Sequence, residues 1–407
     1  MKNKNILISG AGIAGLTLAY WLKQYGFVPT LVEKHPTLRT EGYKIDIRGV
    51  AMEVVKQMGL QASIFEARTE IQKAQFVDSS GKIVKETSPD LCGVRAEGDL
   101  EIVRGDLCQI LFKQVGDIEC LFDDSIKNIS QNENGVNVTF EKNESRLFDL
   151  VIGADGLHSK VRKLGFGEES QFLRELGLYI SFYSIPNYLH LDRVEIEFHS
   201  PKRFVIVYCP RGGMAKAGFA FSSQPLQFDL SDQSQQKKFL EEAYIGSGWE
   251  VPRLLTFMKE APDFYFDCIA QIHMPHWTRG RIALVGDAGY AVSPLAGQGS
   301  SVALVGAYVL AGELAEAVGD YTKAFQRYEE VLGKFVKKNQ KLAQMSIRLM
   351  EGGDTSWITS ILIRLSRHIE KLLPGRWIQF WKNWGLRQTT KAANALTLKE
   401  YQNQRNY

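Results

Sequence analysis

The stretch NILISGAGIAGLTLAYWLKQYGFVPTLVE, residues 5–33, decides the fold of the N-terminal part of the chain. Two short apolar runs, residues 5–9 and 29–33, are typical of buried strands, and residues 16–25 between them carry apolar side chains at helical spacing. A strand, a helix and a second strand in this order predict a βαβ unit with parallel strands. The glycine-rich turn GAGIAG then lies between the first strand and the helix.

This turn has the spacing G-x-G-x-x-G, with glycines at positions 10, 12 and 15. Such glycines allow a tight turn, a close approach of a pyrophosphate to the backbone, and close packing of the helix against the strand. The N-terminal end of the helix also favours negative charge. We therefore predict a dinucleotide site that includes Gly10, Gly12, Ala14 and Gly15.

An acidic residue at the end of the second strand completes the pattern. Glu33 stands 18 residues after Gly15, where its carboxylate can accept hydrogen bonds from ribose hydroxyls. Its negative charge disfavours a ribose 2′-phosphate, so NADP is not expected as the resident ligand of this unit. Lys34, which follows directly, is assigned to the same site.

A second motif, RIALVGDAGYAVSPLAGQG at residues 281–299, indicates which dinucleotide is bound. Asp287 ends a buried strand, where its carboxylate can bind the hydroxyls of a ribityl chain. The turn that follows contains Pro294, Gly297 and Gly299 and precedes a helix, whose N–H groups can stabilise negative charge on a reduced flavin. The motif favours FAD, although Asp287 acting only as a helix cap is the alternative.

Composition narrows the class of protein. A net charge of +3 over 407 residues and the lack of a nucleic-acid-binding motif argue against a nucleic-acid partner. The five cysteines are scattered and form no metal-binding pair, so we expect reduced thiols and no metal. The apolar run at residues 300–312 is too short for a bilayer crossing, and no signal peptide is evident, so we expect a cytoplasmic, monomeric protein without stable membrane association.

The hydrophobic pattern predicts an α/β fold with two interleaved parts and a helical end. Short apolar strands at residues 119–122, 136–140 and 149–153 are expected to rejoin the N-terminal sheet, and alternating patterns indicate a separate antiparallel layer. The predicted FAD-binding domain comprises residues 1–73, 98–175 and 274–333. The predicted substrate-binding domain comprises residues 74–97 and 176–273.

Residues 334–407 are predicted to form a C-terminal helical cap. They contain 14 Lys or Arg against 4 Asp or Glu, and they include Trp357, Trp377, Trp381 and Trp384. We favour helices that pack across the catalytic core, while an interface with another chain and a membrane-surface helix are the alternatives.

The segment VIGADGLHSKVR, residues 151–162, together with the two motifs above, resembles the group A flavin monooxygenases of para-hydroxybenzoate hydroxylase fold. The resemblance implies a Rossmann-type FAD domain with an inserted antiparallel β substrate domain and C-terminal helices. It also implies that Glu33 binds the adenosine ribose, that Arg104 lies along the flavin unless it serves a surface ion pair, and that Asp155 and Asp287 belong to the FAD site.

Four further segments are similar to the tetracycline destructases, which are tetracycline-inactivating monooxygenases. They are YWLKQYGF (20–27), GYKIDIRG (42–49), IPNYL (185–189) and WTRGRIALVGDA (277–288). This resemblance implies that Asp46 contacts FAD and that Arg39 meets NADPH. Gly289, where relatives usually have Ala, is a departure that affects the nearby pocket rather than cofactor binding.

The resemblance implies hydride transfer from NADPH or NADH to FAD, followed by transfer of one oxygen atom from O2 to the substrate. Because no second G-x-G-x-x-G unit exists, the nicotinamide cofactor is expected to visit only transiently. No catalytic side chain is assigned, since the flavin carries the chemistry, and the seven histidines are given no role.

The expected substrate is a tetracycline, whose oxidation inactivates the antibiotic. A catabolic or biosynthetic phenol hydroxylase is the nearest alternative, and a non-catalytic flavin-binding or membrane-docking protein is the alternative from another class. A halogenase is disfavoured because its W-x-W-x-I-P signature is absent. Five residues of the antiparallel layer are candidates for the substrate pocket, with plain core packing as their alternative: Tyr208, Arg211, Met214, Phe219 and Phe221.

Overall fold

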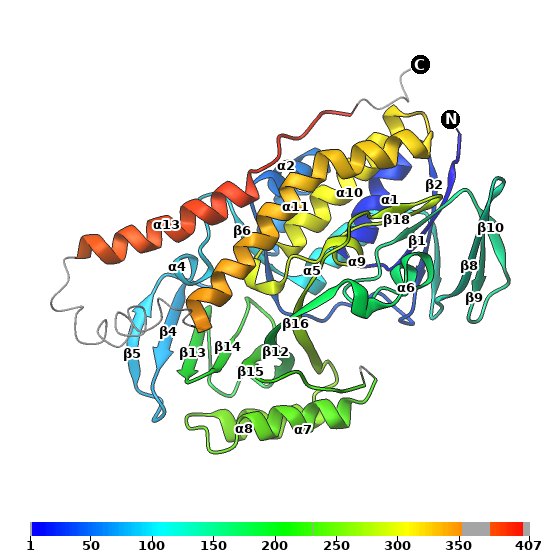
Figure 1. Cartoon of the computed structure of the whole chain (residues 1–407). Helices are drawn as coiled ribbons and strands as arrows, with labels where there is room; N and C mark the ends of the chain where they lie inside the picture. Colours follow the sequence, from blue (N-terminus) through cyan, green and yellow to red (C-terminus); the bar gives the residue numbers. More distant parts are fainter. Residues whose placement is uncertain (1, 230, 352–374, 402–407) are drawn as a thin grey trace.

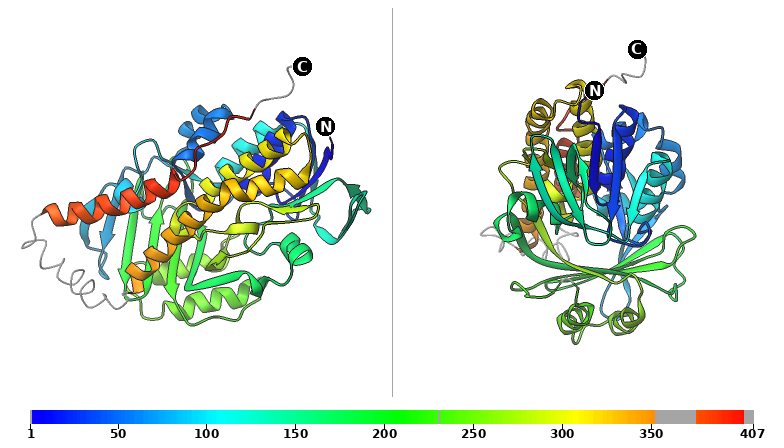
Figure 2. Two further views of the ribbon diagram at one scale, coloured as in Figure 1. Left: turned by 45° about the horizontal axis from the view of Figure 1, so that its top comes forward. Right: turned by 90° about the vertical axis from the view of Figure 1, so that its right-hand side faces the viewer.

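The computed structural model describes residues 2–229, 231–351 and 375–401. Two layers dominate it, a parallel sheet covered by helices and a larger, mainly antiparallel sheet beneath (Figures 1 and 2). Each layer has its own buried apolar core. The α/β class predicted from the sequence is therefore confirmed.

The parallel sheet has six strands in the order β17-β18-β11-β1-β2-β7. Its strands are β1 (Asn5–Ser9), β2 (Val28–Glu33), β7 (Glu119–Phe122), β11 (Leu150–Gly153), β18 (Ile282–Leu284) and the antiparallel edge strand β17 (Thr278–Arg279). Strand β1 pairs with β2 on one side and β11 on the other, and β11 pairs with β18. This order brings three segments that are distant in sequence to one carboxyl edge of the sheet, where ligands bind in such folds.

Helices cover the parallel sheet. Helix α10 (Gly299–Glu316) is buried along almost its whole length, because it lies between α1 (Ile13–Gln24), α2 (Val50–Gln57) and α11 (Tyr321–Glu351). Helix α5 (Arg104–Val115) also packs against α1. The smaller helices are α3 (Gln61–Glu66), α4 (Pro89–Gly93), α6 (Lys160–Phe166), α9 (Asp287–Tyr290), η1 (Glu169–Gln171) and η2 (Pro294–Ala296).

The second sheet has seven strands in the order β16-β12-β15-β14-β13-β4-β5. Its strands are β4 (Lys73–Val77), β5 (Ile83–Thr87), β12 (Leu173–Ile185), β13 (Val194–Ser200), β14 (Arg203–Tyr208), β15 (Ala215–Ser222) and β16 (Tyr265–Ile272). Only β13 and β4 pair in parallel. Helices α7 (Gln233–Ala243) and α8 (Val251–Glu260) cover the face that points away from the parallel sheet (Figure 2). The antiparallel layer predicted from two separate segments is confirmed, while its assignment to substrate binding stays a prediction.

One strand prediction was wrong. Strand β9 (Gly135–Phe140) does not rejoin the parallel sheet but lies in a three-stranded sheet between β8 (Ile126–Asn132) and β10 (Arg146–Phe148). The turn between β8 and β9 is short, so β9 folds back antiparallel on its neighbour in the chain, and β10 occupies its other edge. A two-stranded ribbon of β3 (Lys44–Ile47) and β6 (Leu100–Val103) joins the layers.

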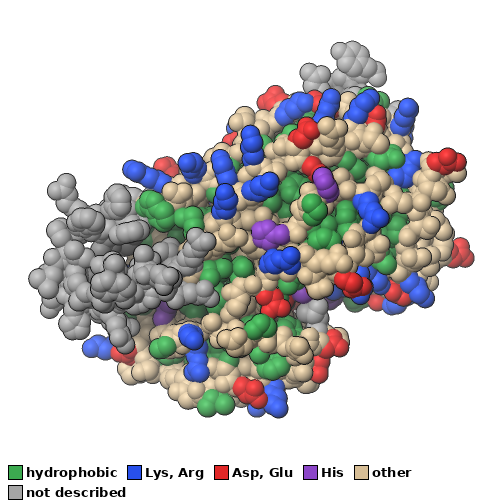
Figure 3. Space-filling view, viewed as in Figure 1, with side chains coloured by type: hydrophobic (Ala, Val, Ile, Leu, Met, Phe, Trp, Pro, Cys, Tyr) green, Lys and Arg blue, Asp and Glu red, His purple; other side chains and the backbone are tan. Residues whose placement is uncertain are grey.

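Most of the described part of the C-terminal region is helical, as predicted, and residues 394–401 are not. Helix α13 (Gly375–Ala393) packs against α11, and the segment that follows returns to α10, where the Tyr401 hydroxyl donates to Glu313 at 2.8 Å. Basic side chains are frequent on the surface over these helices (Figure 3). Trp357 and the side chains of Trp377 and Trp381 lie outside the described residues. Within the described residues, no helix combines the length and apolar character that a bilayer crossing requires.

Candidate functional site

A cavity of about 560 Å³ lies at the carboxyl edge of the parallel sheet, between the two layers. On the side of the parallel sheet, its walls come from the turn after β1, the end of β2, the segment around β3, the start of α5, the loop after β11 and the segment after β18. Strands β12 and β16 of the seven-stranded sheet form the wall on the other side. Twelve of the thirteen residues predicted to bind the cofactor line it: Gly10, Gly12, Ala14, Glu33, Lys34, Asp46, Arg104, Asp155, Asp287, Pro294, Gly297 and Gly299. Arg39, predicted to meet NADPH, lines it as well.

The remaining predicted residue, Gly15, has a packing role. A Cβ atom at Gly15 would lie 1.9 Å from the carbonyl oxygen of Gly10, so only glycine lets the helix approach the turn so closely. Gly12 differs, because the nearest atom to a Cβ there would be Arg104 Nη2 at 3.7 Å. The missing side chain of Gly12 therefore leaves room in the cavity for a ligand next to the backbone, as a pyrophosphate requires.

Glu33 is held at the end of β2 by backbone donors. The N–H of Ala11 donates to Glu33 Oε2 at 2.8 Å, and the N–H of His35 donates to Oε1 at 3.0 Å. These bonds fix the carboxylate beside the glycine turn and leave each oxygen one further lone-pair direction. The position suits acceptance of hydrogen bonds from a ribose.

Arg39 and Arg104 bring positive charge to the cavity. Among the described residues, neither guanidinium group has a carboxylate within 4.0 Å, so the surface-ion-pair alternative for Arg104 is not supported. Burial lowers the pKa of Arg39, and the positive charge of Arg104 lowers it further. Two guanidinium groups without an acidic partner suit an anionic ligand such as a pyrophosphate.

Asp287 begins α9 and also lines the cavity. Its side chain is accessible from the cavity although protein surrounds it, and its carboxylate has no hydrogen bond to a described residue. Burial raises the pKa of Asp287, while the nearby Arg104 lowers it and Asp267 raises it. A carboxylate without protein partners inside a cavity is free to accept hydrogen bonds from a ligand, and ribityl hydroxyls would supply them.

The loop after β11 is held internally. Asp155 accepts hydrogen bonds from the Ser159 hydroxyl and from the N–H of Val161 at 3.0 Å, so both its oxygens shape the start of α6. The fully buried Arg162 donates to the carbonyls of Leu157 and Ala288 at 2.7 and 2.9 Å. Arg162 thereby ties this loop to the segment that carries Asp287. The predicted contact of Asp155 with the cofactor stays a prediction.

His158 lines the cavity but was given no role from the sequence. Its Nδ1 lies 2.9 Å from Glu169 Oε1, and its Nε2 lies 3.1 Å from Asp267 Oδ1 on β16. Burial opposes its charge, but the hydrogen bonds to Asp267 and Glu169 raise the pKa of His158 to about 9. Asp267 is 109 residues away in the chain, so no local spacing could have revealed this pair.

None of the five candidates for the substrate pocket is part of the wall of this cavity. Phe219 and Phe221 are buried in the core between the seven-stranded sheet and α7 and α8, where both contact Tyr244 edge-on. Tyr208 is buried and accepts a hydrogen bond from the Lys44 N–H. Arg211 and Met214 are exposed in the turn between β14 and β15.

For Phe219 and Phe221, the reason is the alternation of side chains along a strand. On β12, Ile180 faces the cavity, and its partner on β15 is Ala220 rather than Phe219 or Phe221. A shift of one residue moves a side chain to the opposite face of a sheet. The apolar pattern alone therefore could not indicate which aromatic residues face the cavity.

Known proteins with related sequences and structures identify the family of this chain. A family model described as an FAD binding domain matches residues 3–330. A flavin-dependent monooxygenase of Legionella longbeachae is 46% identical over 341 residues, which cover 84% of this chain and 88% of the relative.

Two crystal structures of tetracycline destructases match almost the whole chain. Tet(51) is 38% identical with a TM-score of 0.86 and covers 99% of this chain and 100% of its own. Tet(55) is 42% identical with a TM-score of 0.83, and the match covers 98% of this chain and 99% of that one. The predicted para-hydroxybenzoate hydroxylase fold is confirmed. The chain belongs to the family of FAD-dependent monooxygenases that includes the tetracycline destructases.

Proposed function

We propose that this protein consumes NAD(P)H and O2 to hydroxylate, and thereby inactivate, a tetracycline antibiotic. The observation that carries the proposal is the end-to-end similarity to Tet(51) and Tet(55), combined with a cavity that gathers the predicted cofactor residues. The bound FAD would supply the chemistry, as the acceptor of hydride and the group that activates O2. The residues of the chain would bind, orient and shield it.

The residues that line the cavity suit both halves of FAD. Gly12 and Glu33 would hold the pyrophosphate and the adenosine ribose, and the N-terminus of α1 favours the phosphate charge. Asp287 and the turn at residues 294–299 would hold the ribityl chain and the flavin. The N-terminus of α10 begins at Gly299, so its N–H groups are available to negative charge on the flavin.

The side chains that line the cavity would also exclude water and position the substrate. Ile45, Ile180 and Ala291 contribute apolar surface to the cavity. An apolar wall keeps water from the reduced cofactor, and a held substrate gains from proximity. Tetracyclines contain phenol and enol carbons that are already nucleophilic, so the reaction needs no dedicated protein base.

The nicotinamide cofactor would bind only transiently. We assign Arg39 to it, because its guanidinium group has no acidic partner within 4.0 Å among the described residues and lies open to the cavity. An arginine of this kind suits a phosphate group. NADPH and NADH are both candidates as reductant.

The test is incubation of the purified protein with a tetracycline, NADPH and O2, followed by mass spectrometry. We expect a product heavier by one oxygen atom and NADPH oxidation that depends on the tetracycline. Stimulation by simple phenols instead of tetracyclines would indicate a phenol hydroxylase. Vesicle binding without any stimulated NADPH oxidation would indicate the non-catalytic alternative, and a colourless protein that takes up no added FAD would refute the whole assignment.

A further inference from the structure

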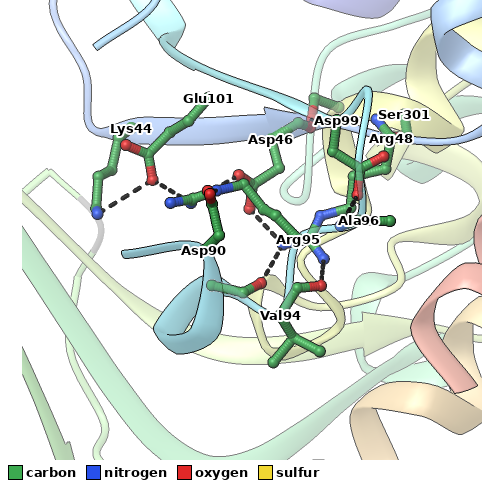
Figure 4. A network of polar contacts seen from close by, with 12 residues as sticks. Lys44, Asp46, Arg48, Asp90, Val94, Arg95, Ala96, Asp99, Glu101 and Ser301 are labelled. Atoms are coloured by element: carbon green, nitrogen blue, oxygen red, sulfur yellow. Dashed lines mark hydrogen bonds and ion pairs between the residues drawn. The ribbon is translucent and has the colours of Figure 1, made fainter. Parts of the chain in front are cut away.

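A row of alternating charges connects Glu195 of the seven-stranded sheet to Asp46, and Figure 4 shows its part from Lys44 to Asp46. Lys44 bridges Glu195 of β13 and Glu101 of β6, with a distance of 3.1 Å from its Nζ to Glu101 Oε2. Arg95 then bridges Glu101 and Asp46, and its Nη1 lies 3.2 Å from Asp46 Oδ1. All of these side chains are largely buried.

Two members of this row, Lys44 and Asp46, line the cavity, and two arginines hold Asp46. Arg95 contacts Asp46 Oδ1, and Arg48 Nη2 contacts Oδ2 at 2.6 Å. The side chains of Arg48 and Arg95 are 3% and 6% exposed, against 15% for Asp46. One cation on each oxygen restricts rotation of the carboxylate, and charge-assisted bonds between buried groups are stronger than those at the surface.

Arg48 also joins Asp46 to the turn that we assign to the flavin end. A Cβ atom at Gly297 would lie 3.2 Å from Arg48 Nη2, so the guanidinium group lies directly against this turn. The N–H of Arg48 donates to the Ser301 hydroxyl at 3.0 Å, and the Ser300 hydroxyl donates to the carbonyl of Asp46. The segment around β3 and the start of α10 are thus fixed to one another.

The other nitrogen contacts of Arg48 reach the loop that follows α4. Arg48 donates to the carbonyls of Gly93 and Val94, at 2.6 and 2.8 Å. Val94 has a φ of 52°, a left-handed conformation that is unfavourable for a β-branched residue. The neighbouring Arg95 also binds Asp90 at 2.9 Å. Both arginines therefore depend on a loop that belongs to the predicted substrate-binding segment 74–97.

We propose that Arg48 and Arg95 are positioning residues that hold the Asp46 carboxylate in one orientation toward FAD, and that Arg95 thereby connects the seven-stranded sheet to the cofactor site. This inference rests on the proposed contact between Asp46 and FAD. Neither arginine lines the cavity, so each acts through Asp46. Without Arg95, only Arg48 holds the Asp46 carboxylate, which can then rotate. FAD must fix the orientation of this carboxylate when it binds, and this ordering reduces the binding free energy.

A double-mutant cycle on FAD affinity tests the proposal. The variants are Arg95→Met, Asp46→Asn and their combination, with the dissociation constant of FAD measured by fluorescence quenching in the apoprotein. We expect each single variant to weaken FAD binding about tenfold and the double variant to bind no more weakly than Asp46→Asn alone. Arg146→Met, which removes an ion pair with Glu119 outside the cavity, is the matched control and should leave FAD affinity unchanged.

Rescue distinguishes positioning from a general loss of structure. Arg95→Lys retains a positive charge and should recover part of the lost affinity, and its use covers the case in which Arg95→Met fails to fold. The proposal would be overturned if Arg95→Met weakened FAD binding equally in the wild-type protein and in the Asp46→Asn variant. It would also be overturned if both Arg95 variants bound FAD as tightly as the wild-type protein. If the wild-type protein itself binds no FAD, the proposed function fails instead.

Discussion

The two walls of the cavity hold their polar groups in different ways. On the wall from the parallel sheet, Arg39, Arg104 and Asp287 have no side-chain ion pair among the described residues, and the turn at Gly12 leaves open space. On the wall that meets the seven-stranded sheet, His158 and Asp46 are each bound by two groups of opposite charge. The comparison indicates that the first wall is arranged to receive a ligand, whereas the second is arranged to stay rigid while one is bound.

The largest effects should come from two glycines of the same turn. A substitution at Gly15 should mainly reduce stability, and one at Gly12 should mainly reduce FAD binding. Gly15→Ala places a Cβ atom 1.9 Å from a backbone oxygen, so we expect a loss of more than about 3 kcal/mol in the free energy of unfolding. Gly12→Ala should change that free energy by less than about 1 kcal/mol, because its Cβ atom enters open space, yet it should reduce FAD binding. Chemical denaturation of the apoproteins and FAD titration measure both. Equal stability of the two variants would contradict this account of the turn.

Removal of the Asp287 carboxylate should mainly weaken the binding of FAD. We expect Asp287→Asn or Asp287→Ala to lower FAD affinity by about 10- to 100-fold, because hydrogen bonds to a charged group are lost. The apoprotein should lose no stability, since Asp287 makes no hydrogen bond to a described residue. Absorbance of the purified protein near the flavin bands reports the bound fraction, with Asp192→Asn as an exposed control. A fully loaded yellow Asp287→Ala protein would exclude the assigned role.

On the wall that meets the seven-stranded sheet, the contribution of His158 to the free energy of unfolding should depend on pH. Its pKa in the folded protein, about 9, is above the unfolded value of 6.5, so the ion pairs with Asp267 and Glu169 stabilise the fold fully below pH 6.5. This contribution is lost as the pH rises through 9. We expect His158→Gln to lower the free energy of unfolding by about 1–3 kcal/mol at pH 6 and by much less at pH 10. Urea titrations at the two pH values measure the difference, and a constant difference would show that the charge of His158 is unimportant.

The smallest effects should come from Phe221 and Met214, which do not line the cavity. Phe221→Leu should cost about 1 kcal/mol of stability without changing the KM for a tetracycline, because Phe221 packs against Tyr179 and Tyr244. Met214→Ala, at an exposed position, should change stability by less than about 0.5 kcal/mol. Thermal unfolding and steady-state kinetics test both. A large rise in KM with either variant would restore the prediction that these residues bind substrate.

Predictions from the sequence were most successful where one short segment contains the whole signal. The glycine turn, Glu33 and Asp287 lie within or next to recognisable strand ends, and the structure brings them to one cavity. Strand β9 was misplaced because its apolar alternation is compatible with either sheet, and hairpin pairing with β8 decided between them. Phe219 and Phe221 of β15 lie on the face of the sheet away from the cavity for a similar reason, since alternation does not say which face of a sheet meets the cavity.

The sequence by itself determined the βαβ unit, the order of the chemical motifs and the likeness to a flavoprotein family. These follow from local spacing, because turns, strand lengths and helix starts depend on neighbouring residues. Only the tertiary structure decided that Asp46 meets Arg95 and that His158 meets Asp267, which are 49 and 109 residues apart. Contacts at such separations depend on how the two sheets pack together, and no local pattern of side chains encodes that packing.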